Sequence, residues 1–256
     1  LQNPTCDHVA AKIAALEGGT AAMLTGSGQA ANFMAMFNIA GCGDHIVSSA
    51  SIYGGSYNLF AVTMKRMGVD VTFVDPDSTP EELDAAFRPN TKLVFGETIA
   101  NPALTVLDIE KFAAAAHRHG VPLIVDASQS AGILPINMKS LGAAYIAMPG
   151  HKGLYGPQGT GVLLCGDGQM PRPLLEGGTG SISLSQEMPD FLPDRIEAGT
   201  HNMPGIAGLL AGIRFVRRQG TQAILRHEHA LTCRTAESLR RLPGVEVFAR
   251  PGCPAQ

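Results

Sequence analysis

A short glycine-rich run near the middle of the chain places a lysine where it could do covalent chemistry. The run reads PGHKG at 149–153, and an apolar segment upstream, 121–125, ends at Asp126. A lysine that follows a buried carboxylate in this order predicts a Schiff base between Lys152 and pyridoxal phosphate, with Asp126 paired to the ring nitrogen. The alternative is that Lys152 lies on a surface turn and Asp126 caps a helix.

The turn at 25–29, TGSGQ, has the composition of a phosphate site and joins an expected strand at 21–24 to an expected helix at about 30–39. Small residues at the start of a helix leave backbone N–H groups and the positive end of the helix dipole available to a phosphate. The turn also matches the dinucleotide pattern G-x-G-x-x-A, but the only acid near the next expected strand, Asp44, precedes that strand. We therefore interpret the turn as a mononucleotide-like phosphate site, and an NAD-dependent oxidoreductase is the least favoured alternative.

Further polar and aromatic residues follow other expected strands. Tyr53 follows the strand at 46–49 and precedes two glycines, which predicts a ring that stacks on a flat cofactor, with half-buried packing as the alternative. Asn101 follows the strand at 92–95. Because strands alternate with helices, we expect a mainly parallel, doubly wound α/β sheet, in which ligands bind at the carboxyl ends of the strands.

The overall composition excludes several classes of partner. The 256 residues are 45% hydrophobic and 16% charged, with a net charge of -3, which gives no reason to expect nucleic acid or an anionic membrane as a partner. Runs of about eighteen apolar residues and signal patterns are absent from the sequence. The five cysteines are scattered without a C-x-x-C pair, which predicts reduced thiols and a cytoplasmic protein.

The chain length fits one large domain and part of a second. We expect a cofactor-binding domain at 1–204 and the incomplete start of a small domain at 205–256, with both ends of the sequence cut. The i, i+2 spacing of His117/His119 and His227/His229 points their rings apart on helices, so no metal site is expected. The remaining patterns predict helices at 7–18, 56–66, from Thr79, 108–119, 205–219 and 222–242, and strands at 71–74, 141–148, 160–165 and 244–248.

Two sets of motifs carry family resemblances. The first set is NPT at 3–5, ALEGG at 15–19, SGQAA at 27–31, GETIANP at 96–102 and HGVPLIVD at 119–126; the second is VDASQSAG at 125–132, PGHKGLYGPQGTG at 149–161, GGTGS at 177–181 and PDRIEAGTHNMPGIAGL at 193–209. Residues 3–126 resemble O-acetylhomoserine sulfhydrylases of the Cys/Met-metabolism family of pyridoxal-phosphate enzymes. Residues 126–250 resemble class V aminotransferases of the cysteine desulfurase type. Both families have fold type I, and the change between them indicates a mosaic sequence.

The resemblance implies a role for each matching residue. It assigns the phosphate to Ser27, Gly28 and Gln29, ring stacking to Tyr53, the ring's 3′-oxygen to Asn101 and Gln129, the ring nitrogen to Asp126, the aldehyde to Lys152, and either the phosphate or lysine orientation to His151. Thr200 would reach the phosphate in a neighbouring subunit, which implies a homodimer or a dimer-based oligomer.

The resemblance implies an enzyme of sulfur amino-acid metabolism that performs γ-replacement or elimination on O-acylhomoserine or cysteine-like substrates. The alternatives are a cysteine desulfurase or class V aminotransferase, and a fragment that binds pyridoxal phosphate but turns over poorly. Sulfhydrylases carry hydroxyl residues where this chain has Pro149 and His151, and desulfurases stack a histidine where it offers Tyr53. The arginine that binds the substrate carboxylate in both families lies beyond the matched region, and none of the five cysteines falls in a desulfurase motif.

Overall fold

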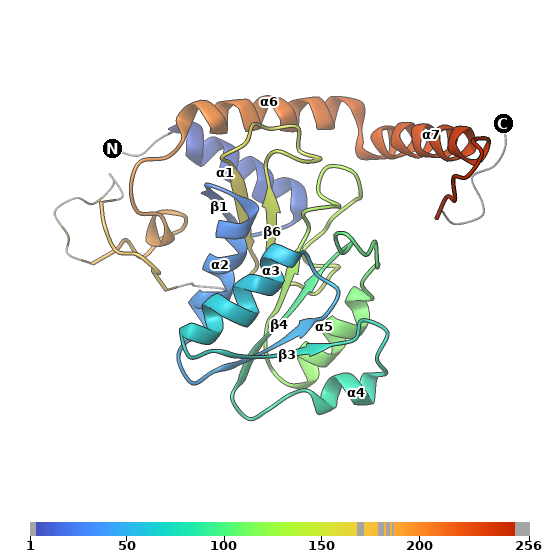
Figure 1. Cartoon of the computed structure of the whole chain (residues 1–256). Helices are drawn as coiled ribbons and strands as arrows, with labels where there is room; N and C mark the ends of the chain where they lie inside the picture. Colours follow the sequence, from blue (N-terminus) through green and yellow to red (C-terminus); the bar gives the residue numbers. More distant parts are fainter. Residues whose placement is uncertain (1–3, 168–171, 179–181, 183–184, 186, 249–256) are drawn as a thin grey trace.

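A computed structural model describes residues 4–167, 172–178, 182, 185 and 187–248 of the chain (Figure 1). Its centre is a seven-stranded sheet in the order β1-β7-β6-β5-β4-β2-β3. The strands are β1 (Ala21–Thr25), β2 (His45–Ser49), β3 (Asp70–Val74), β4 (Thr91–Glu97), β5 (Leu123–Asp126), β6 (Tyr145–Pro149) and β7 (Gly161–Cys165). Strands β3, β2, β4, β5 and β6 run parallel, whereas β7 is antiparallel to both β6 and β1. The expected mainly parallel α/β fold is therefore confirmed.

Helices cover both faces of this sheet, which buries the strands on both sides. They are α1 (Pro4–Glu17), α2 (Gly28–Ile39), α3 (Gly54–Asn58) continued by a π-helical segment (Leu59–Met64), α4 (Pro80–Ala85), α5 (Ile109–Arg118), a 3-10 turn (Asp194–Ile196), α6 (Met203–Gln219) and α7 (Thr221–Arg240). Alternate residues of β4 enter different cores: Phe95 packs with residues of α2, and Val94 packs with residues of α1, α5 and α6. This two-sided burial explains why the strand sequences are almost continuously apolar.

Side-chain caps fix the beginnings of the helices near the sheet. Ser27 accepts a hydrogen bond from the Ala30 N–H at the start of α2, and Asp108 accepts one from the Lys111 N–H at the start of α5. Thr79 and Glu82 form a reciprocal capping box before α4. These caps satisfy N–H groups that the first helical turn leaves unpaired.

The expected strand at 244–248 is wrong. Residues 245–248 carry no strand assignment, and the side chain of Phe248 is 89% exposed. This segment follows α7, which projects away from the sheet (Figure 1), so its backbone lies far from the sheet edges that could pair with it. An apolar alternation is not sufficient for a strand when no partner strand is within reach.

The C-terminal helices differ in how they are supported. Ile206, Leu209 and Ile213 of α6 join the core beside α1, whereas α7 extends beyond it. The division into domains at residue 204 remains a prediction. Among the described residues, no helix is long and apolar enough to cross a membrane.

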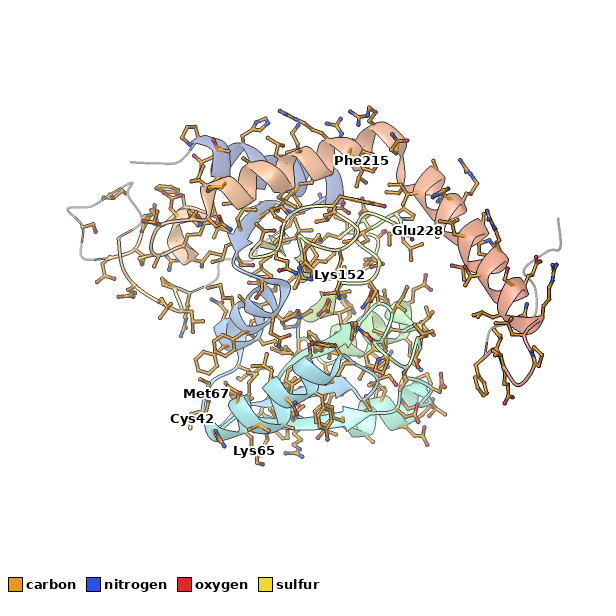
Figure 2. All side chains as sticks on the ribbon, turned by 45° about the horizontal axis from the view of Figure 1, so that its top comes forward. Cys42, Lys65, Met67, Lys152, Phe215 and Glu228 are labelled. Carbon is orange, nitrogen blue, oxygen red and sulfur yellow. The ribbon has the colours of Figure 1, made fainter. Side chains whose placement is uncertain are left out.

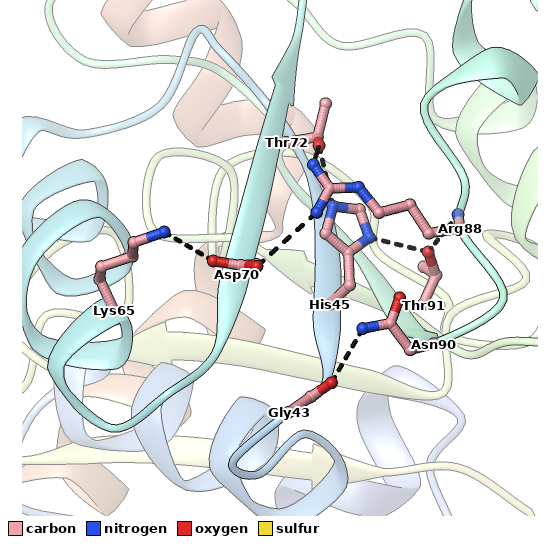
Figure 3. A network of polar contacts seen from close by, with 8 residues as sticks. All are labelled: Gly43, His45, Lys65, Asp70, Thr72, Arg88, Asn90 and Thr91. Atoms are coloured by element: carbon pink, nitrogen blue, oxygen red, sulfur yellow. Dashed lines mark hydrogen bonds and ion pairs between the residues drawn. The ribbon is translucent and has the colours of Figure 1, made fainter.

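A polar network joins the amino ends of β2, β3 and β4 (Figure 3). Both ring nitrogens of the fully buried His45 lie 2.8 Å from threonine hydroxyls, those of Thr91 and Thr72. Arg88 donates to Thr72 and forms an ion pair with Asp70. The network secures the strand ends opposite to those that carry the residues predicted to bind a cofactor.

Candidate active site

Asp126 and Glu97 lie side by side where β5 and β4 end. They are register partners in adjacent parallel strands, and their side chains are 3% and 2% exposed. Register partners project their side chains on the same face of a sheet. The structure therefore brings two buried carboxyl groups together at this edge, of which the sequence predicts only Asp126.

Two donors hold the carboxylate of Asp126. The backbone N–H of Ser128 donates to Oδ1 at 2.8 Å, and Asn32 Nδ2 donates to Oδ2 at 2.5 Å. Burial raises the pKa of Asp126, while these hydrogen bonds and the charge of Lys152 oppose the rise. A turn rather than a helix follows the residue, so Asp126 does not act as a helix cap.

Glu97 connects this carboxylate to the segment that carries Tyr53. Its Oε2 accepts the backbone N–H of Tyr53 at 2.6 Å, whereas Oε1 is buried and has no hydrogen-bond partner among the described residues. Burial first, and then the charge of Asp126, raise the pKa of Glu97 to about 7, against the opposing effects of the Tyr53 N–H and Lys152. A buried acceptor without a donor is unusual unless a ligand supplies one.

Lys152 lies in the loop between β6 and β7 and is partly buried. Figure 2 shows it near the middle of the molecule, whereas Lys65 lies at the margin. Its amine interacts electrostatically with both Asp126 and Glu97. The alternative of an isolated surface lysine therefore does not describe this residue.

Glycines allow the loop after β5 to touch the Lys152 loop. Gly132 has φ +81°, and a Cβ atom on it would overlap the carbonyl oxygen of Gly153. A Cβ atom on Gly150 would likewise overlap the hydroxyl of Thr160. Larger residues at these positions would displace the loop that carries Lys152.

The turn at 25–29 packs directly against both ends of the same loop. A Cβ atom on Gly28 would lie 2.9 Å from Pro149 N, and one on Gly161 would overlap the backbone of Ser27. Because the Ser27 hydroxyl oxygen accepts the Ala30 N–H, its own proton remains available to a ligand at the start of α2. This arrangement offers a phosphate site next to an amine and two carboxyl groups.

The other predicted site residues are less buried than Asp126. Tyr53 is 48% exposed at the start of α3, and the Gln29 side chain accepts from the Ser56 hydroxyl at 3.4 Å. Asn101 and Gln129 are partly buried in the turns after β4 and β5.

His151 and Thr200 are exposed. The segment of Thr200 is tied to the sheet through Glu197, which lies 2.7 Å from His201 Nε2 and accepts the Leu24 N–H at 3.2 Å. Glu197 therefore joins the segment that precedes Thr200 to β1, the strand that leads into the 25–29 turn.

The described residues contain no group of three or more His, Cys, Asp or Glu side chains arranged to hold a metal ion. His119 stacks on Phe87 and lies 3.1 Å from the carboxylate of Asp84.

Cys6, Cys42 and Cys165 are free thiols, whereas Cys233 is disulfide-bonded, in contrast to the reduced state expected for it.

Comparison with known proteins identifies the family. Residues 1–151 match the family of Cys/Met metabolism PLP-dependent enzymes. The chain belongs to this family. Pyridoxal phosphate is the family's cofactor, and the site fits it: a glycine-lined phosphate turn, an amine, and a buried carboxyl oxygen of Glu97 that has no donor of its own among the described residues.

Two relatives are O-acetyl-L-homoserine sulfhydrylases. The enzyme of Corynebacterium glutamicum is 52% identical over 126 residues, covering 49% of this chain and 29% of that protein. O-acetyl-L-homoserine sulfhydrylase 1 of Thermus thermophilus is 43% identical over 146 residues, covering 57% of this chain and 35% of that protein. The chain thus spans about a third of the length of these relatives.

A similar solved structure is that of an apo cysteine desulfurase from Thermococcus onnurineus NA1. It superposes with a TM-score of 0.76 and 27% identity, covering 92% of this chain and 62% of that chain. Both resemblances seen in the sequence are therefore confirmed, and with them fold type I. The family match extends to residue 151, further than the 3–126 stretch that first indicated it.

Proposed function

We propose that this chain forms the cofactor-binding part of a pyridoxal-phosphate enzyme that performs γ-replacement or elimination on O-acylhomoserine or cysteine-like substrates. The observation that carries the proposal is the buried carboxyl pair Asp126 and Glu97, register partners at the ends of β5 and β4, with the charge of Lys152 nearby and the 25–29 turn packed against the Lys152 loop. The sulfhydrylase relatives support the substrate class.

The predicted residues around the cofactor divide its binding among them in this proposal. Bound pyridoxal phosphate supplies an electron sink for the substrate's α-carbon. Ser27, Gly28 and Gln29 bind the phosphate at the start of α2. Tyr53 covers one face of the ring.

On the other side of the site, Asp126 binds the ring nitrogen, and Asn101 and Gln129 bind the ring's 3′-oxygen. His151 contacts the phosphate or orients Lys152.

Lys152 performs the covalent and proton-transfer work. Its Nζ would hold the cofactor's aldehyde, and as a free amine it would take a proton from the substrate's α-carbon and return it. Asp126 and Glu97 supply negative charge near this amine. Lysine rather than arginine suits the task because its amine can act as a base.

Cysteine desulfuration or class V aminotransfer is the second candidate. It is favoured by the structural neighbour, which covers 92% of the chain, whereas the sulfhydrylase relatives cover about half. A third candidate is a chain that binds the cofactor but turns over slowly for lack of a carboxylate anchor. Arg195, the arginine in the matched loop, donates to the Pro189 carbonyl at 3.3 Å.

Borohydride reduction with peptide mapping tests the cofactor role. Purified protein incubated with pyridoxal phosphate and reduced should carry the pyridoxyl label on Lys152. Lys139, an exposed lysine that pairs with Asp167, serves as the control: Lys139→Ala should keep the label and Lys152→Ala should lose it. A label on another lysine, or no label, would contradict the proposal.

Product analysis separates the candidates. Homocysteine from O-acetylhomoserine and sulfide supports γ-replacement, and alanine from cysteine supports desulfuration. A protein labelled on Lys152 that forms neither product corresponds to the slow fragment.

A further inference from the structure

Asn32 contacts Asp126 from the helix that begins at the phosphate turn. It lies one turn into α2, and its side chain is 1% exposed. Ala31 and Ala35, both fully buried, give α2 a small-residue surface against the sheet. Close approach of α2 brings Asn32 Nδ2 to 2.5 Å from Asp126 Oδ2.

The orientation of the Asn32 amide follows from its neighbour. An amide oxygen in this position would face a carboxylate oxygen, so the nitrogen must occupy it. Asn32 Oδ1 is then buried without a hydrogen-bond partner among the described residues. An aliphatic side chain of similar size would fill the space without that unpaired oxygen, so packing alone does not explain an asparagine here.

The two donors to Asp126 leave part of its carboxylate available. A carboxylate offers about four acceptor positions. Ser128 N occupies one on Oδ1, and Asn32 Nδ2 occupies one on Oδ2. Because the donors come from different segments, they fix the rotation of the carboxylate and favour its ionised form despite its burial.

We propose that Asn32 is a positioning residue that holds Asp126 so that the remaining acceptor positions face the ring nitrogen of the cofactor. The inference rests on the proposed function, because it assumes that Asp126 pairs with that nitrogen. It adds a residue to the site that contacts the cofactor only through Asp126.

A cofactor analogue tests this role by binding alone. In 1-deazapyridoxal phosphate a carbon replaces the ring nitrogen, so the analogue cannot pair with Asp126. Equilibrium dialysis of the full chain gives the ratio of the two affinities. Wild-type protein should prefer pyridoxal phosphate, and Asn32→Leu should reduce this preference about tenfold or more, the size expected for a hydrogen bond to a charged group.

Two further variants keep the test informative. Asn38→Leu makes the same change on the same helix, where Asn38 contacts Arg172 instead, and should keep the wild-type preference. Asn32→Ala repeats the comparison with a smaller side chain if Asn32→Leu does not fold.

Equal losses of affinity for both compounds, or an unchanged preference, would show that Asn32 is only structural and overturn the inference. A wild type that binds pyridoxal phosphate without preferring it would remove Asp126 from the ring nitrogen, and Asn32 with it. A wild type that binds neither compound would overturn the proposed function itself.

Discussion

Glu97 and Asp126 stand opposite each other in adjacent parallel strands, with both carboxyl groups buried. Two carboxylates this close disfavour each other's ionisation, and burial adds to the effect. Lys152 offsets part of this cost electrostatically. The pair therefore gives the site a protonation equilibrium near neutral pH, centred on Glu97.

The Glu97→Gln variant should change the pH dependence of stability of the cofactor-free protein. Because the folded-state pKa of Glu97, about 7, exceeds the ordinary value of 4.5, the folded state binds more protons between these values. The stabilising contribution of Glu97 is present below pH 4.5 and is lost as pH rises through about 7. Glutamine does not titrate, so it removes this loss. Between pH 5 and pH 8 the free energy of unfolding of the variant should therefore rise by about 1–2 kcal/mol relative to that of wild type, after allowance for solvent screening.

Urea unfolding at both pH values measures the difference. Glu110→Gln, at an exposed position in the first turn of α5, is the control and should leave the pH dependence of wild type unchanged. Parallel pH profiles for wild type and Glu97→Gln would contradict the assignment.

The Asp126→Asn variant should retain some binding of pyridoxal phosphate but lose turnover. Asparagine is close in size and keeps an acceptor oxygen, but it cannot neutralise a charged ring nitrogen. Turnover of the preferred substrate should fall at least about tenfold, or ~1.4 kcal/mol. Steady-state rates at saturating cofactor measure the loss, with the exposed Asp77→Asn as control. A smaller fall would remove Asp126 from this role.

Some features of the fold and the site follow from local sequence, and others depend on tertiary structure. The strand ends near Asp126 and the 25–29 turn are predictable because the apolar runs of the two strands are unambiguous: β5 ends at Asp126 and β1 ends at Thr25. The binding roles of these residues stay predictions. Glu97 and Asn32 are missed because their importance arises from the register of β4 with β5 and from the close approach of α2, neither of which is visible in local sequence. The strand expected at 244–248 fails for the same reason: its alternation is local, whereas a strand needs a partner.

The buried His45 should make the protein less stable in acid (Figure 3). Burial first, and then the charge of Arg88, lower its pKa, against the opposing charge of Asp70. The folded state therefore prefers the neutral ring. The stability that neutral His45 contributes is present above the ordinary pKa of 6.5 and is lost as pH falls through its lower pKa in the folded state.

Replacing His45 isolates that contribution. His45→Gln should lower the free energy of unfolding by about 1–3 kcal/mol at pH 8, because buried threonine hydroxyls lose a partner. This difference from wild type should shrink as pH falls below 6.5. Thermal unfolding of wild type and variant from pH 8 to pH 5 measures the trend, with the exposed His117→Gln as control. A cost that is constant with pH would mean that His45 does not titrate in this range.

Thr200 is predicted to complete the phosphate site of a neighbouring subunit. It is exposed, so a second copy of the chain can reach it, and nearby Glu197 joins its segment to β1 by accepting the Leu24 N–H. Light scattering should therefore show a dimer, and Thr200→Val should weaken binding of pyridoxal phosphate.

Mixed dimers decide which subunit supplies the threonine. In a mixed dimer, the Thr200→Val subunit keeps Lys152 and the Lys152→Ala subunit keeps Thr200. These two intact residues belong to the same cofactor site only if the contact of Thr200 crosses the interface. Equal mixing with random exchange of subunits should then restore borohydride labelling at about half of the sites that carry Lys152, relative to Thr200→Val alone, at a limiting cofactor concentration. Labelling that stays at the level of Thr200→Val would mean that Thr200 acts within its own subunit or outside the site.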